Sequence, residues 1–216
     1  MYTTANGPLE RLGLLVFSYL APTVLGSTGC SYFSNCVTPQ RLEHGYTVIL
    51  PGVEGLNSAN SNLAQGLKNA GYSGAIEIDN WTTGSFLLLP VHLWNLDWNR
   101  RGALRIARKI VTYQDRYPGR PVHVIGHSGE GGVALWALEA LPPGHTVTSA
   151  ILLAPAVSPK YNLLEALDHT DAGIWNFYSP IDVFVLGTGT SLFGTIDGKS
   201  TPSAGAVGFR FPRQPS

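Results

Sequence analysis

Apolar residues along this chain form short continuous runs, separated by longer stretches in which apolar positions recur every three or four residues. The runs are rich in β-branched residues and predict strands at 46–50, 75–79, 122–125, 147–154 and 174–178. The stretches between them predict helices at 63–70, 101–117 and 129–141. This alternation indicates an α/β fold.

The connections decide how the strands pair. A strand that returns through a helix of this length pairs in parallel with its neighbour, so we expect a mostly parallel sheet with helices on both faces. The nearly continuous apolar run at 151–154 is typical of a strand buried on both sides. A chain of 216 residues suits one domain, which we expect to occupy 31–216.

Residues 1–30 differ in composition from the rest and predict an export signal: a basic residue, an apolar stretch at 12–20 and small residues before Cys30. The stretch is short and Pro22 follows it, which argues against a transmembrane helix. The small residues resemble a lipoprotein cleavage box, although Ser27 stands where the box usually has an aliphatic residue. Lipidation of Cys30 would attach the exported protein to a membrane. The alternative is a buried element of a cytoplasmic protein.

Charge and cysteine content exclude some functions. Lys plus Arg and Asp plus Glu are both 14, so the chain has no net charge that favours nucleic acid. We interpret the basic stretch at 99–109 as the solvated face of a helix whose other face is Leu104, Ala107 and Val111. Two cysteines without CxxC spacing argue against zinc, and we expect no metal or organic cofactor.

The strongest chemical signal is the segment 121–132, PVHVIGHSGEGG, in which an apolar strand breaks at Ser128 into small residues that open a helix. This is the sequence form of a nucleophile elbow and predicts acyl transfer to water through a covalent serine intermediate. Gly126 would allow a close approach of strand and helix, and the backbone N–H of Gly129 would stabilise an oxyanion. Glu130 stands where the usual G-x-S-x-G pattern has its second glycine.

With two further segments, the serine segment resembles the α/β-hydrolase family over roughly 45–200. The resemblance implies a serine esterase, lipase or peptidase that acts on an ester or amide of an acyl substrate. Residues 48–55 look like the family's oxyanion loop, in which the N–H of Val53 completes the oxyanion hole with Gly129. Asp182 follows the late strand where the family has its orienting acid. For residues 48–55 the alternative is an ordinary Pro-Gly turn, and for Asp182 it is a turn or helix-capping aspartate.

Three aromatic residues of the segment before the 101–117 helix, Trp81, Phe86 and Trp94, are candidates for an acyl pocket, with plain packing as the alternative.

Asp168, Asp171 and Asp197 are weaker candidates for the acid.

Histidine is the member of the triad that the sequence does not supply in the family's order. The histidines are His44, His92, His123, His127, His145 and His169. None follows Asp182, and His169 would require a rearranged triad. We therefore interpret the chain as a truncated or frameshifted, C-terminally incomplete hydrolase, in which Ser128 without a base would keep only the residual rate that oxyanion stabilisation and substrate binding provide. The alternative is a non-catalytic α/β-hydrolase-like binding protein or surface lipoprotein.

Overall fold

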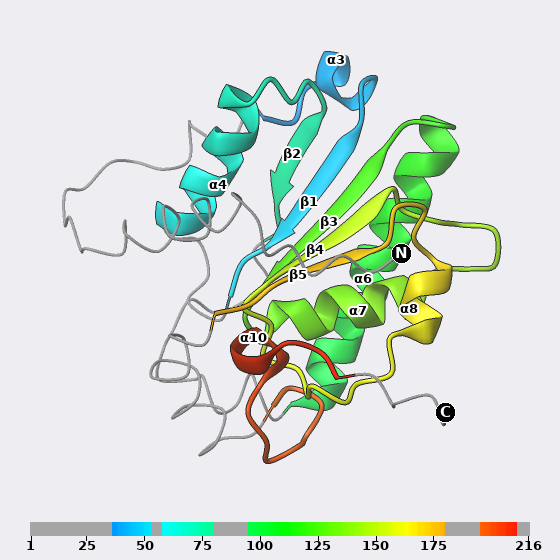
Figure 1. Cartoon of the computed structure of the whole chain (residues 1–216). Coiled ribbons are helices and arrows are strands. Elements are labelled where there is room, and N and C mark those ends of the chain that lie inside the picture. The colour runs from blue at the N-terminus through cyan, green and yellow to red at the C-terminus, as the bar shows by residue number, and fades with distance from the viewer. Residues whose placement is uncertain (1–35, 53–57, 80–94, 180–194, 211–216) are drawn as a thin grey trace.

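The protein contains a five-stranded sheet in which every strand pairs in parallel with its neighbours. The structure, a computed structural model, describes residues 36–52, 58–79, 95–179 and 195–210. The strands are β1 (Tyr46–Leu50), β2 (Ala75–Ile78), β3 (Val122–His127), β4 (Ser149–Leu153) and β5 (Ile174–Phe177). Their spatial order is β2-β1-β3-β4-β5 (Figure 1). The predicted α/β fold with a parallel sheet is confirmed.

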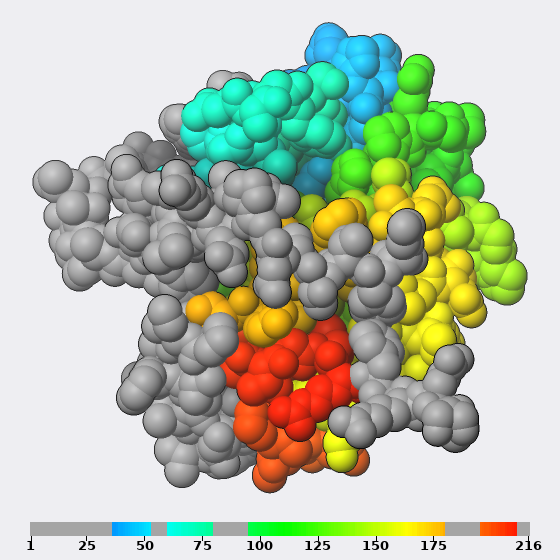
Figure 2. Space-filling model, in the orientation of Figure 1, coloured from blue at the N-terminus to red at the C-terminus, as the bar shows by residue number. Residues whose placement is uncertain are grey.

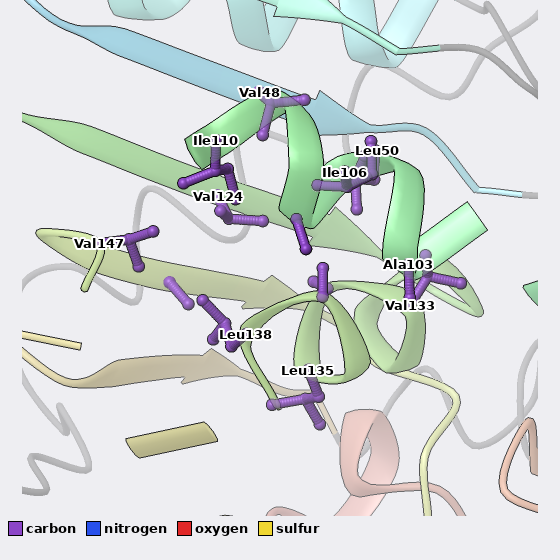
Figure 3. Close-up of a cluster of buried hydrophobic side chains, with 14 of the residues drawn as sticks. Val48, Leu50, Ala103, Ile106, Ile110, Val124, Val133, Leu135, Leu138 and Val147 are labelled. Atoms are coloured by element: carbon purple, nitrogen blue, oxygen red, sulfur yellow. The ribbon is translucent and has the colours of Figure 1, made fainter. Parts of the chain in front are cut away.

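Helices cover both faces of this sheet, as the fold class predicts. They are α3 (Pro39–Leu42), α4 (Ser58–Asn69), α6 (Leu96–Arg116), α7 (Glu130–Glu139), α8 (Leu164–Asp168) and α10 (Ala204–Val207). Alternate residues of a strand point to opposite faces. Val48, Leu50 and Val124 therefore join the core with α6 and α7, whereas Ile49 and Ile125 pack with α4. Figure 3 shows the first of these clusters, in which Ile106 and Val133 meet the strands.

The predicted strands match the observed ones within two residues at each end, but the start of α6 does not match. This helix begins at Leu96, five residues before the predicted start, because the side chain of Asn95 accepts a hydrogen bond from the backbone N–H of Trp98 at 3.0 Å. The predicted inner face was also partly wrong. Leu104 is 45% exposed, while Ala103, Ile106 and Ile110 are buried.

The final described segment, 195–210, packs at the carboxyl ends of β4 and β5. The N–H of Ile196 donates to the carbonyl of Ala156 at 2.9 Å, and the N–H of Gly205 donates to Pro155 at 2.9 Å. The side chain of Asn176 donates to the carbonyl of Ala204 at 3.3 Å. In Figure 2 this segment, orange to red, lies directly against β5. Within the described residues, β5 is an edge strand of the sheet.

Several predicted features lie outside the described residues: the export signal at 1–30 with Cys30, the oxyanion donor Val53, the aromatic residues Trp81, Phe86 and Trp94, the histidine His92 and the acid Asp182. The other cysteine, Cys36, is buried beside β2, and its carbonyl accepts a hydrogen bond from the N–H of Ile76 at 3.0 Å. In the part of the chain that the structure describes, no helix is both long enough and apolar enough to cross a membrane.

Candidate active site at the carboxyl edge

Ser128 lies in a sharp turn between β3 and α7, with a backbone φ of 55°. This left-handed conformation is strained for a residue with a side chain, and it persists only where the surroundings hold it. The N–H of Ser128 donates to the carbonyl of Leu153 at 2.9 Å. Its carbonyl accepts from the N–H of Gly131 at 3.0 Å and from that of Ala156 at 2.9 Å. These bonds attach the turn to both α7 and the end of β4.

Gly126 makes this turn sterically feasible. A Cβ at this position would lie 2.6 Å from the carbonyl oxygen of Glu130 and 2.9 Å from the Cα of Gly131, both of which are backbone atoms. Backbone atoms of a helix cannot move aside as a flexible side chain can. Any side chain at residue 126 would therefore push α7 away from β3 and change the position of Ser128.

Gly129 places a backbone donor beside the serine. It is the N-cap residue of α7, with φ −55° and ψ −37°, and it is buried. Among the described residues its N–H has no hydrogen-bond acceptor. An N–H at the positive end of a helix can stabilise the negative oxygen of a tetrahedral intermediate. Ser128 itself is half-buried.

A second strained residue lies at the end of the neighbouring strand. Ala154, directly after β4, has a φ of 46°, and with Ser128 it makes up the non-glycine residues of positive φ in the described chain. Its N–H donates to the carbonyl of Phe177 at 2.9 Å. A Cβ on Gly205 would collide with the Ala154 backbone, so the C-terminal segment packs tightly against this turn. Backbone strain in the described residues is thus concentrated at the carboxyl edge of the sheet.

His169 lies with His145 at the opposite, amino edge of the sheet, which excludes it as the base and corrects the rearranged-triad hypothesis. Its Nδ1 is 2.7 Å from the carbonyl oxygen of His145, next to the bridge between Val147 and Thr170. Ser128 is bonded to Leu153, at the other end of β4. A strand rises about 3.3 Å per residue, so about 20 Å separates the two positions.

The remaining described histidines are also accounted for. His123 lies early in β3, with its Nδ1 2.8 Å from the Oγ of Ser149, and burial lowers its pKa. His44 is exposed before the start of β1. His127, the last residue of β3, shares the face of Ile125 and therefore the α4 side of the sheet. Of the described histidines, only His127 lies at the edge that carries Ser128.

The weaker candidates for the acid of the triad also lie at different edges of the sheet. Asp171 bonds through its N–H to Val147 at 2.9 Å, and Asp168 precedes His169, so both lie at the amino edge. Asp197 lies at the carboxyl edge, but its Oδ1 accepts a hydrogen bond from the N–H of Ser158 at 2.9 Å. That bond gives Asp197 a role in holding a turn. Asp182, the predicted acid, lies outside the described residues and stays a prediction.

The structure also shows a group of charges that the sequence interpretation missed. Asp79, directly after β2, is 5% exposed and binds both nitrogen arms of Arg105, at 2.8 and 2.5 Å. Lys109 bridges Asp79 at 2.5 Å and Glu77 at 2.6 Å, and Glu77 accepts from the hydroxyl of Tyr46 at 2.5 Å. The signal was present in the sequence: two acids two residues apart on a strand and two bases four apart on a helix each share a face.

The pKa values follow from this arrangement. Burial alone would raise the pKa of Asp79. The hydrogen bonds and charges of Arg105 and Lys109 have the larger effect and hold the pKa of this carboxyl group below its ordinary value. The hydrogen bond to Asp79 raises the pKa of Arg105, and the charge of Glu130 adds to that effect. Burial and the neighbouring Glu77 carboxylate raise the pKa of Tyr46. At neutral pH Asp79, Arg105 and Lys109 are therefore ionised, and Tyr46 is neutral.

Glu130 is 3% exposed in the first turn of α7, where a negative charge is favourable to the helix dipole. In the described residues, no group of three or more His, Cys, Asp or Glu side chains is placed to hold a metal ion.

No known protein family and no curated protein matches this chain. The fold and the geometry around Ser128 therefore define its class, an α/β protein with a strained serine at the carboxyl edge of a parallel sheet.

Proposed function

We propose that this protein is a serine hydrolase of the α/β-hydrolase type, which cleaves an ester or amide through an acyl-enzyme. The observation that carries the proposal is the conformation of Ser128: a non-glycine residue at φ 55° between a parallel strand and a helix. Such strain is costly, by about 1 kcal/mol or more, and it is typically found at functional sites. At an elbow it presents the hydroxyl group to a substrate.

In the proposed reaction the Oγ of Ser128 attacks the acyl carbon and its proton passes to a base. The carbonyl oxygen becomes an oxyanion, stabilised by the N–H of Gly129 and, in our proposal, by that of Val53. Collapse of this intermediate expels the alcohol or amine, which takes the proton from the base. Water then attacks the acyl-serine by the same steps in reverse order and regenerates the hydroxyl group.

The strand order supports these assignments. The segment with Val53 leaves the end of β1 and the segment with Asp182 leaves the end of β5, and both strands end at the same edge as β3. Since β1 is the immediate neighbour of β3, its loop begins about 5 Å from the elbow. Strand β5 is two strands away, about 10 Å, a span that a histidine between serine and aspartate would bridge.

A second candidate function is a non-catalytic binding protein with a hydrolase-like elbow. It is favoured by the placement of the histidines, since the described ones other than His127 lie away from Ser128. A serine without a base retains only the rate enhancement that substrate binding and the oxyanion donors provide.

Hydrolysis of p-nitrophenyl butyrate distinguishes the two functions. For a hydrolase we expect turnover that Ser128→Ala lowers more than about 1000-fold, because the acyl-enzyme cannot form. The control is Ser158→Ala, which removes another serine hydroxyl at the same edge and should leave turnover unchanged. Folded wild-type protein that hydrolyses the ester no faster than Ser128→Ala would overturn the proposal in favour of the binding protein.

A further inference from the structure

Helix α6 is much longer than the strands it covers, and this places its first turns beyond the carboxyl edge. The hydroxyl of Tyr113 donates to the carbonyl of Leu42 at 2.6 Å, near the amino edge, whereas Arg105 binds Asp79 at the carboxyl edge. At 1.5 Å per residue, Trp98 lies about 10 Å further along the helix axis than Arg105. Figure 1 shows α6 extending past the strand ends.

These first turns form one side of an open hollow. It is lined by Asn95, Trp98, Arg101, Gly102 and Arg105. The indole of Trp98 contributes an apolar wall and is 37% exposed, and Gly102 adds no side chain to the floor. Helices α6 and α7 both follow parallel strands, so both begin at the edge that carries Ser128. The charge of Glu130, two residues after Ser128 in the first turn of α7, acts on Arg105 of this hollow, so the hollow and the serine lie at the same end of the sheet.

Its charge is positive. Arg101 makes a 3.3 Å hydrogen bond from Nε to the carbonyl of Asp97, and it forms no ion pair with any residue that the structure describes. The guanidinium of Arg105 is neutralised by Asp79 on its inner side, yet its side chain is 44% exposed. A guanidinium group binds a carboxylate through two parallel hydrogen bonds, and an aromatic wall favours a planar, apolar body attached to that carboxylate.

We infer that the hollow at the start of α6 is a subsite for a carboxylate carried by the substrate, with Arg101 as its main ligand. The inference rests on the proposed function, since it assigns the substrate class of the Ser128 site. The preferred substrates are then half-esters or half-amides that bear a free carboxylate at one end and the bond to be cleaved at the other.

The test compares two esters in three proteins. We expect Arg101→Gln to lower kcat/KM for the p-nitrophenyl half-ester of succinate by about ten-fold, the loss of one charge-assisted contact, and to leave p-nitrophenyl butyrate unchanged. The matched control is Arg108→Gln, which removes the same charge from an exposed position of α6 outside the hollow. An equal loss of kcat/KM for the half-ester in both variants would mean that only the overall positive charge of α6 matters. That result would overturn the subsite.

Equilibrium binding of benzoate, with neutral benzamide as the matched ligand, separates failure of the subsite from failure of the proposed function. We expect benzoate to bind wild type and Arg108→Gln equally and Arg101→Gln about ten-fold more weakly, with benzamide insensitive to either change. Benzoate binding of this pattern without ester turnover would refute the hydrolase and keep the anion site. Turnover without any selective effect of Arg101→Gln would refute the subsite and keep the hydrolase.

Discussion

The two edges of the sheet carry similar residue types but differ in how those residues are held. At the carboxyl edge, Ser128 and Ala154 adopt strained backbone conformations, and Glu130 and Asp79 are buried acids. At the amino edge, His169 bonds to a carbonyl in an ordinary turn. Ligands of open parallel sheets bind at the carboxyl ends of the strands. The difference shows that strain and buried charge, more than the presence of a histidine or an aspartate, mark the candidate site.

The largest effect is expected for Gly126→Ala. The new Cβ would lie 2.6 Å from a backbone oxygen of α7, so the helix must shift, and we expect a loss of about 2 to 3 kcal/mol in unfolding free energy. Chemical denaturation measures it. Gly66→Ala is the matched control, because a Cβ there, within α4, meets nothing within 4 Å and should stabilise the helix by about 0.5 kcal/mol or more. Equal stability of the two variants would show that the strand–helix approach is not tight.

A smaller effect is expected for Asp79→Asn, which keeps the shape and removes the charge that Arg105 and Lys109 bind. We expect a loss of about 2 kcal/mol in unfolding free energy at pH 7. Because the pKa of Asp79 is lowered in the folded protein, its contribution is present above the ordinary value of 3.8 and is lost as the pH falls through the folded pKa. The variant should therefore lose less stability in acid than wild type does.

The measurement is a series of denaturation curves between about pH 7 and pH 2, where the Asp79 contribution disappears. Asp115→Asn is the control, since this aspartate is exposed on the same helix, takes no part in the ion pairs of the cluster and should leave the stability at pH 7 unchanged. An Asp79→Asn variant with the same acid slope as wild type would contradict the charge cluster.

The smallest effect is expected at the amino edge. His169→Gln removes the 2.7 Å contact with the His145 carbonyl and should cost about 1 kcal/mol or less of stability. Because the position is about 20 Å from the elbow, ester turnover should remain that of wild type. A large loss of turnover in a folded His169→Gln protein would place this histidine in the mechanism and reverse the comparison of the two edges.

The strands and the elbow were predictable from sequence because each depends on local pattern. A β-branched run followed by Gly126 and Ser128 defines a strand, a close approach and a turn within a few residues. The partition of histidines and aspartates between the edges was not predictable in the same way. His169 follows Ser128 in the chain, and only the bridge from Val147 to Thr170 shows which end of β4 it occupies.

The charge cluster was missed for a related reason. The basic stretch of α6 was interpreted as solvated because apolar spacing was used to choose the inner face, and that choice put Leu104 inside. The structure turns Arg105 and Lys109 toward the acids of β2, because two ion pairs with Asp79 satisfy a carboxylate that lies beside the core. Pairing between a strand and a helix depends on their relative position, which hydropathy alone does not contain.

The most direct measurement is the site at which a fluorophosphonate reacts with the folded protein, determined by peptide mapping. The probe forms a stable covalent bond with an activated serine. The elbow geometry predicts modification of Ser128, and its loss in Ser128→Ala with no new site elsewhere. Folded protein that is unmodified, or that is modified at another serine while Ser128 stays intact, would contradict the assignment of Ser128 as the nucleophile.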